Sequence, residues 1–97
     1  MIYHITTISD WHNALEQGSY TAGSLEKEGF LHSSYDHQLR GVVERYYKGS
    51  TDLILLHIDE SKVTSEIKYE LSPSVNEVFP HIYGPLNLDA VVDVSNV

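Results

Sequence analysis

The chain contains no cysteine and has few residues of positive charge. Without cysteine it forms no disulfide and has no thiolate for catalysis or metal binding. Only 6 Lys and Arg stand against 14 Asp and Glu, which gives a formal net charge of −8. That balance argues against a surface that binds nucleic-acid phosphates or an anionic membrane. No apolar run is long enough to span a bilayer and no secretion signal precedes the first strand-like run, so we expect a cytoplasmic protein.

Several motifs of catalytic and metal sites are also missing. The sequence has no His-x-x-x-His, no His-Glu-x-x-His and no clustered carboxylate loop, so the spacing predicts no metal site. It has no Gly-x-Ser-x-Gly elbow, which argues against a serine hydrolase of that type. The 97 residues predict one domain, residues 1–97, with a single modest core.

Apolar residues at two different periods predict both strands and helices. Strands are expected at residues 2–6, 30–33, 52–59, 67–71, 78–83 and 90–94. A helix is expected at residues 10–18, capped by Ser9 or Asp10 and ended by Gly18, and a short helical turn at residues 25–28. A second main helix follows a cap at Ser34 or Asp36, carries an apolar stripe and ends at Gly49. The stripe consists of Leu39, Val42, Val43, Tyr46 and Tyr47.

These elements predict the α+β class. We expect a small, split and twisted sheet, mostly antiparallel, with two main helices packed on it. The run Leu53–Leu56 leaves no polar face on its strand, so both faces of that strand are expected to be covered.

Four of the six histidines lie inside strand-like apolar runs, at positions 4, 32, 57 and 81. An imidazole on such a surface needs a polar partner, a ligand or water. His57 alternates with Leu53 and Leu55, which indicates a structural role. The other three can either build one cleft from separate strands or be core histidines bonded within the protein.

Polar residues near these histidines extend the candidate site. Thr6 shares a predicted strand face with His4, Ser33 follows His32 at a strand end, and Tyr83 shares a face with His81. The carboxylate of Glu70 is a candidate to stabilise positive charge in a transition state. Arg45, on the predicted second helix, is a candidate partner for an anionic group. Helix capping by Ser33 and solvent exposure of Glu70 and Arg45 remain the structural alternatives.

With these residues in view, the chain resembles a small bacterial family known as domain of unknown function 952. The matching features run nearly end to end, and the last of them is the most specific. They are Ile2-Tyr3-His4-Ile5-Thr6, Trp11, Gly18-Ser19-Tyr20, Ser24-Leu25, Glu28-Gly29-Phe30-Leu31-His32-Ser33, Gln38, Arg45, Asp52-Leu53, Ile58-Asp59, Tyr69-Glu70 and Phe79-Pro80-His81-Ile82-Tyr83-Gly84-Pro85-Leu86.

The opening half also resembles the ADP-ribosyltransferase-like superfamily, in particular the RNA 2′-phosphotransferases. Those enzymes begin with a strand of the form aromatic-His-Gly-Thr and continue to an apolar strand bearing His-x-Ser. Tyr3-His4-Ile5-Thr6 and Leu31-His32-Ser33-Ser34 match these two elements. The resemblance implies that the first contacts the ribose side of NAD and that the second frames the nicotinamide ribose.

In many of these enzymes a third strand supplies a Glu that stabilises an oxocarbenium-like ribose, and Glu70 or the His81–Tyr83 strand is the nearest counterpart. Ile5 replaces the Gly that lets the nucleotide approach the backbone, and phosphate-binding arginines are scarce. The resemblance therefore implies an ADP-ribosyltransferase-like fold and an NAD-like or nucleoside-containing ligand rather than transfer to RNA.

The sequence thus predicts one cleft and leaves its use open. Glu70 and His32 are the predicted catalytic residues. The predicted ligand-binding residues are His4, Thr6, Ser33, Arg45, His81 and Tyr83. An ADP-ribosyltransferase-like enzyme, a non-catalytic module that binds a small metabolite and a structural or partner-binding domain are the three hypotheses. NAD is the implied cofactor or substrate, and the sequence leaves the oligomeric state undetermined.

Overall fold

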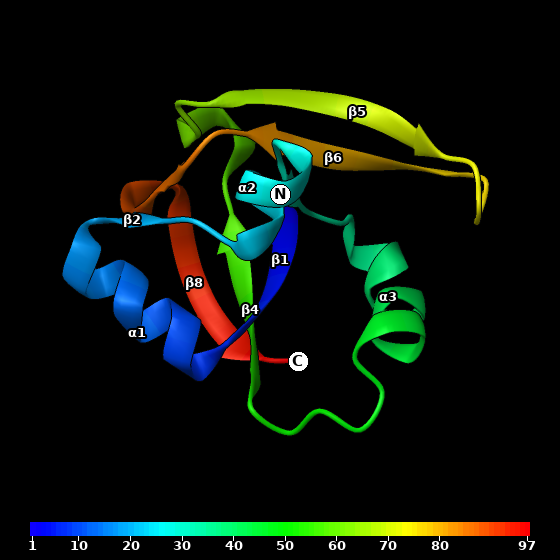
Figure 1. Ribbon diagram of the computed structural model, residues 1–97, viewed down its shortest axis with the longest axis horizontal. Coiled ribbons are helices and arrows are strands. Elements are labelled where there is room, and N and C mark those ends of the chain that lie inside the picture. Colours follow the sequence, from blue (N-terminus) through cyan, green and yellow to red (C-terminus); the bar gives the residue numbers. More distant parts are fainter.

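The structure, a computed structural model of residues 1–97, consists of three antiparallel sheets and three α-helices (Figure 1). The sheets have the strand orders β1-β4-β8, β3-β6-β5 and β2-β7. The strands are β1 (Ile2–Thr7), β2 (Ser19–Tyr20), β3 (Leu31–His32), β4 (Leu53–Ile58), β5 (Glu66–Ser72), β6 (Glu77–Tyr83), β7 (Leu86–Asn87) and β8 (Val91–Asn96). The helices are α1 (Ile8–Gln17), α2 (Gly23–Glu28) and α3 (Leu39–Tyr46). The predicted α+β class with mostly antiparallel pairing is confirmed.

The first helix begins earlier than predicted. The Thr7 hydroxyl oxygen accepts a hydrogen bond from the backbone N–H of Asp10 at 3.1 Å, so Thr7 caps α1. Ser9 and Asp10 were therefore the wrong capping residues. The end at Gly18 is confirmed, since Gly18 has φ 87°, a left-handed conformation that glycine adopts at low cost.

The second main helix has a different start from the predicted one. A 3-10 turn, Asp36–Gln38, precedes α3, and the Gln38 side chain accepts a hydrogen bond from the backbone N–H of Tyr35 at 2.9 Å. Neither Ser34 nor Asp36 caps the helix: the backbone of Ser34 pairs with β1, and Asp36 is the first residue of the 3-10 turn. The helix ends at Tyr46, three residues before Gly49.

The core lies where the three sheets meet. On β1 and β4, Ile2 pairs with Ile58 and His4 with Leu56, so these four side chains share one face of that sheet. The three apolar ones are fully buried. The remaining members of the core come from the other two sheets, α1 and the turn before β8: Ala14, Tyr20, Leu31, Ile82, Leu86 and Ala90.

Residues 31–34 connect two of the sheets. Leu31 and His32 pair with Ile82 and His81 on β6. The backbone of Ser34 then exchanges two hydrogen bonds, both 2.8 Å long, with Tyr3 on the free edge of β1. The histidine-bearing strands therefore converge at the point where the sheet splits.

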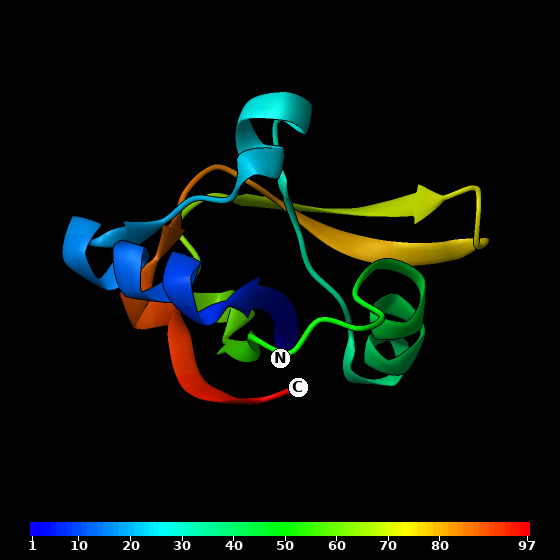
Figure 2. The same ribbon diagram turned by 60° about the horizontal axis from the view of Figure 1, so that its bottom comes forward.

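The β5–β6 hairpin extends beyond the core toward α3 (Figures 1 and 2). The Gln38 side-chain amide donates a 2.9 Å hydrogen bond to the carbonyl of Val78, which fastens the hairpin to the start of α3. No helix of the structure is long and apolar enough to cross a membrane.

Candidate functional site

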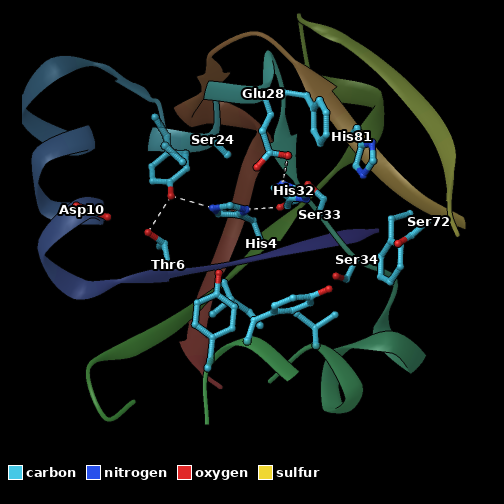
Figure 3. Close-up of a pocket in the computed structure, with 18 of the residues that line it drawn as sticks. His4, Thr6, Asp10, Ser24, Glu28, His32, Ser33, Ser34, Ser72 and His81 are labelled. Carbon is cyan, nitrogen blue, oxygen red and sulfur yellow. Dashed lines mark hydrogen bonds and ion pairs between the residues drawn. The ribbon is translucent and has the colours of Figure 1, made fainter. Parts of the chain in front are cut away.

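A cleft of about 750 Å³ opens at the split between the sheets. Its lining comes from β1, α1, β2, α2, β3, α3 and the β5–β6 hairpin, so segments far apart in the sequence contribute to one space (Figure 3). The lining residues are His4, Ile5, Thr6, Thr7, Asp10, Tyr20, Ala22, Ser24, Glu28, Phe30, His32, Ser33, Ser34, Val42, Tyr46, Tyr47, Leu71, Ser72, Pro73, Phe79 and His81. The cleft has the size of a typical small-molecule site.

His4 is buried at the centre of this cleft and both of its ring nitrogens are bonded within the protein (Figure 3). Nδ1 contacts the backbone carbonyl of His32, and Nε2 lies 2.8 Å from the Tyr20 hydroxyl. The same hydroxyl lies 2.8 Å from the hydroxyl of Thr6. His4 therefore ties β1 to β3 and to β2, and its ring has no nitrogen left for a ligand.

The protonation states along this series of hydrogen bonds follow from burial. Burial lowers the pKa of His4 to about 4, so the ring is neutral at physiological pH. A carbonyl only accepts, so Nδ1 carries the proton and Nε2 must accept from Tyr20. Burial raises the pKa of Tyr20 to about 12, which keeps its single proton in place. Because that proton is donated to His4, Thr6 donates to the Tyr20 oxygen.

His81 is held by a carboxylate and by an aromatic ring. Its Nδ1 lies 2.9 Å from Oε1 of Glu70, which is also bonded by the Tyr83 hydroxyl. These hydrogen bonds, the one from Tyr83 first, lower the pKa of Glu70. On the other side, the ring of Phe30 stacks on His81 with centroids 4.1 Å apart and planes inclined by 17°. The imidazole is therefore fixed in one orientation.

His32 has a carboxylate partner of its own. Its Nε2 lies 3.1 Å from Oε2 of Glu28 at the end of α2. The rings of His32 and His81 lie side by side, with centroids 5.5 Å apart, because the two residues are paired across β3 and β6. In its neutral form each ring can donate the bonded N–H to its carboxylate and keep the other nitrogen as an acceptor, Nδ1 in His32 and Nε2 in His81.

Ser33 is buried beside this pair, and its hydroxyl has no hydrogen-bond partner in the protein. An unpaired buried hydroxyl costs about 1–3 kcal/mol, so such a group signals a partner from outside the chain. Ser33 is also one of the residues that line the cleft.

We therefore expect Ser33→Ala to leave the free energy of unfolding unchanged or to raise it by up to about 1 kcal/mol. Urea unfolding of the ligand-free protein measures this change. Ser95→Ala is the matched control, because it removes the 2.7 Å contact with Nε2 of His57 and is expected to cost about 1 kcal/mol. A loss above about 1 kcal/mol in Ser33→Ala would mean that the hydroxyl is already satisfied.

The structure brings five of the eight predicted site residues into the lining of the cleft: His4, Thr6, His32, Ser33 and His81. Glu70 and Tyr83 lie behind His81, outside the lining, and Lys68 contacts the ring of Tyr83 from 4.6 Å. Arg45, on α3, is also outside the lining, and its guanidinium lies 5.8 Å from the ring centre of Tyr46, a residue that lines the cleft.

His57 lies outside the cleft, as its predicted structural role requires. It is half-buried on the other face of β4, beside Tyr3, with a ring-centroid distance of 5.1 Å.

Sequence reasoning missed three residues that shape the site. Glu28 and Asp10 are the two carboxylates that line the cleft, and Tyr20 orients His4. Glu28 precedes His32 by four residues, a spacing that is informative only within one helix, and here a glycine turn separates them. Tyr20 lies in a two-residue strand, too short to show an alternating pattern.

The cleft has an acidic character and no metal-ligand cluster. No Lys or Arg lines it. Nowhere in the chain do three His, Asp or Glu side chains gather closely enough to hold a metal ion.

Three solved structures of one protein, CC0527 from Caulobacter crescentus, are similar to this chain at 27% sequence identity. The X-ray structure covers 97% of this chain and 82% of that protein, with a TM-score of 0.88, and the X-ray structure of a double mutant gives 0.87 with the same coverage. The solution NMR structure covers 99% and 83%, with a TM-score of 0.84.

No curated protein matches the chain. The family model described as "Protein of unknown function (DUF952)" matches residues 5–94, nearly the whole length. The chain therefore belongs to the DUF952 family of proteins of unknown function.

Proposed function

We propose that the cleft binds a ribonucleoside compound of the NAD type and cleaves its N-glycosidic bond. One observation carries this proposal: His32 and His81 lie side by side in the cleft, each oriented by a carboxylate and each with one free basic nitrogen. Imidazoles fixed in this way are suited to accept protons from a bound hydroxyl or water.

The ribose would be held at the polar end of the cleft. The unpartnered hydroxyl of Ser33 pairs with one ribose hydroxyl, and Nδ1 of His32 accepts from another. His4 contacts no ligand atom in this arrangement, because both of its nitrogens are in use. It positions the backbone of His32 instead.

The reaction would be a hydrolysis. The bond between C1′ and the pyridinium nitrogen breaks, the leaving nicotinamide keeps the electron pair and becomes neutral, and positive charge develops on the ribose. The carboxylate of Glu28, which lines the cleft, stabilises that charge. Water attacks C1′ and passes its proton to Nε2 of His81. The products are ribose (or the ribosyl remainder), nicotinamide and one proton.

His81 is better suited than His32 to act as the base. The His81 side chain is 13% exposed, against 55% for His32, and Phe30 and Glu70 fix its ring. A rigid base meets its substrate in one geometry, which lowers the entropic part of the barrier. Glu70, which we predicted to be catalytic, acts here through His81 as a positioning residue.

Two substitutions test this proposal. His81→Gln and Glu28→Gln are each expected to lower the rate of nicotinamide release from NAD or nicotinamide riboside by about 100-fold or more. Chromatography of the released nicotinamide measures the rate. His57→Gln is the matched control, because His57 lies outside the cleft, and its rate should equal that of the unmodified protein.

Binding is followed separately through the ring NMR signals of His32 and His81. Glu70→Gln is expected to lower kcat with little change in KM, since it disturbs the base and not the ligand contacts. Shifts of both rings without nicotinamide release would instead favour a non-catalytic binding module. No shift with millimolar NAD and nicotinamide riboside would contradict the proposal as a whole.

A further inference from the structure

We infer that the ligand of this cleft carries no phosphate: the site is built for an N-ribosyl pyridinium cation, a nucleoside of the nicotinamide riboside class. This inference rests on the proposed function and narrows its substrate. It follows from the charges that surround the cleft and from the two polar groups that would meet the ribose.

None of the six cationic side chains of the protein is among the residues that line the cleft. Arg40 pairs with Glu44 at 3.5 Å on the exposed face of α3. Arg45 and Lys68 contact the rings of Tyr46 and Tyr83. A phosphate or pyrophosphate bound in the cleft would therefore find no Lys or Arg among the lining residues, and these are the side chains that proteins use to hold such groups.

The carboxylates that line the cleft add repulsion to this lack of attraction. Asp10 lies in the first turn of α1. Among the helices that begin at the cleft, α1 is the one long enough for its N-terminus to attract an anion. Its carboxylate already meets the positive end of that helix, and its backbone N–H is bonded to Thr7. Glu28, at the end of α2, is the second carboxylate in the lining. Both charges disfavour a phosphate and favour a pyridinium cation.

A second, independent observation points to a ribosyl group in the same place. Ser33 is only 2% exposed and lines the cleft, and its hydroxyl has no hydrogen-bond partner. Nδ1 of His32, the preceding residue, makes no hydrogen bond within the protein and is free to accept. These two groups can pair with hydroxyls of a ribose, and Tyr46, Leu71 and Phe79 add apolar and aromatic surface to the lining.

Three compounds that share the same ribosyl pyridinium test the inference. Nicotinamide riboside has no phosphate, nicotinamide mononucleotide has one, and NAD has a pyrophosphate and a second nucleoside. Titration of the full chain, followed by the His32 and His81 ring signals, gives the three affinities. We expect the riboside to bind about tenfold or more tightly than either phosphorylated compound, since like charges at close range are strongly disfavoured.

Two variants test the physical cause. Glu28→Gln is expected to reduce the preference for the riboside severalfold. Ser24→Lys places a cation in the lining and is expected to shift the preference toward the mononucleotide. Phosphorylated compounds that bind the unmodified protein as tightly as the riboside, or more tightly, overturn the inference and leave the proposed function standing. If none of the three compounds shifts either ring, the proposed function fails as well.

Discussion

Acidification from about pH 6.5 to about pH 4 is expected to remove about 3 kcal/mol of folding free energy through His4 alone. Burial lowers the pKa of His4 to about 4 in the folded protein, while the unfolded chain keeps the ordinary value of 6.5. Between these values the unfolded chain binds the proton and the folded protein does not. Stability is therefore full above about pH 6.5 and falls as the pH is lowered through this window.

Urea unfolding at a series of pH values measures this loss. His4→Gln is the matched control, because an amide retains a donor and an acceptor but does not titrate. Its stability should be nearly constant from about pH 6.5 down to about pH 4.5. The carboxylates of Glu60 and Glu70, whose pKa values are lowered by hydrogen bonds, lose their contribution only below about pH 4.5. Equal losses in both proteins above that pH would contradict the assignment of the effect to His4.

Tyr20→Phe is expected to lower the free energy of unfolding by about 3 kcal/mol, with a fall in Tm of roughly 15 °C. The Tyr20 hydroxyl is bonded both to Nε2 of His4 and to the hydroxyl of Thr6, each at 2.8 Å. Phenylalanine fills the same space but leaves these two buried groups without a partner. Each of these two unpaired groups lowers the free energy of unfolding by about 1–3 kcal/mol.

Thermal unfolding of Tyr20→Phe measures the effect, with Tyr46→Phe as the control. Tyr46 is 65% exposed and bonds no buried group, so its substitution should change stability by less than about 0.5 kcal/mol. A cost below about 1 kcal/mol for Tyr20→Phe would mean that water replaces the hydroxyl. Such a result would mean that solvent reaches the centre of the cleft in the variant.

Local patterns predicted the elements that carry the site. The alternation around His4, the strand end at His32 and the aromatic run around His81 each gave a strand, and each strand was found with small changes at its ends. The amphipathic stripe gave α3, and Gly18 gave the end of α1. These features depend on side-chain period and on backbone conformation, both of which a short segment determines for itself.

The assignment of roles among the polar residues could not be made in this way. Glu70 was expected in the cleft, yet it lies behind His81, because it is diagonal to that residue across β5 and β6. Glu28 reaches His32 only because the chain turns at Gly29, which has φ 88°. Neither arrangement has a signature in the order of the amino acids near these positions.

The sequence by itself thus determined the α+β class, the three histidine-bearing strands and the acidic, cysteine-free composition that excludes whole classes of site. Only the tertiary structure decided three features of the site. Both ring nitrogens of His4 are bonded within the protein, His32 and His81 each keep one unbonded ring nitrogen, and the Ser33 hydroxyl lacks a hydrogen-bond partner. The physical reason is that a hydrogen bond is decided by distances of a few tenths of an ångström. Such distances between residues far apart in the chain are fixed by strand register and by how the sheets pack, not by local sequence.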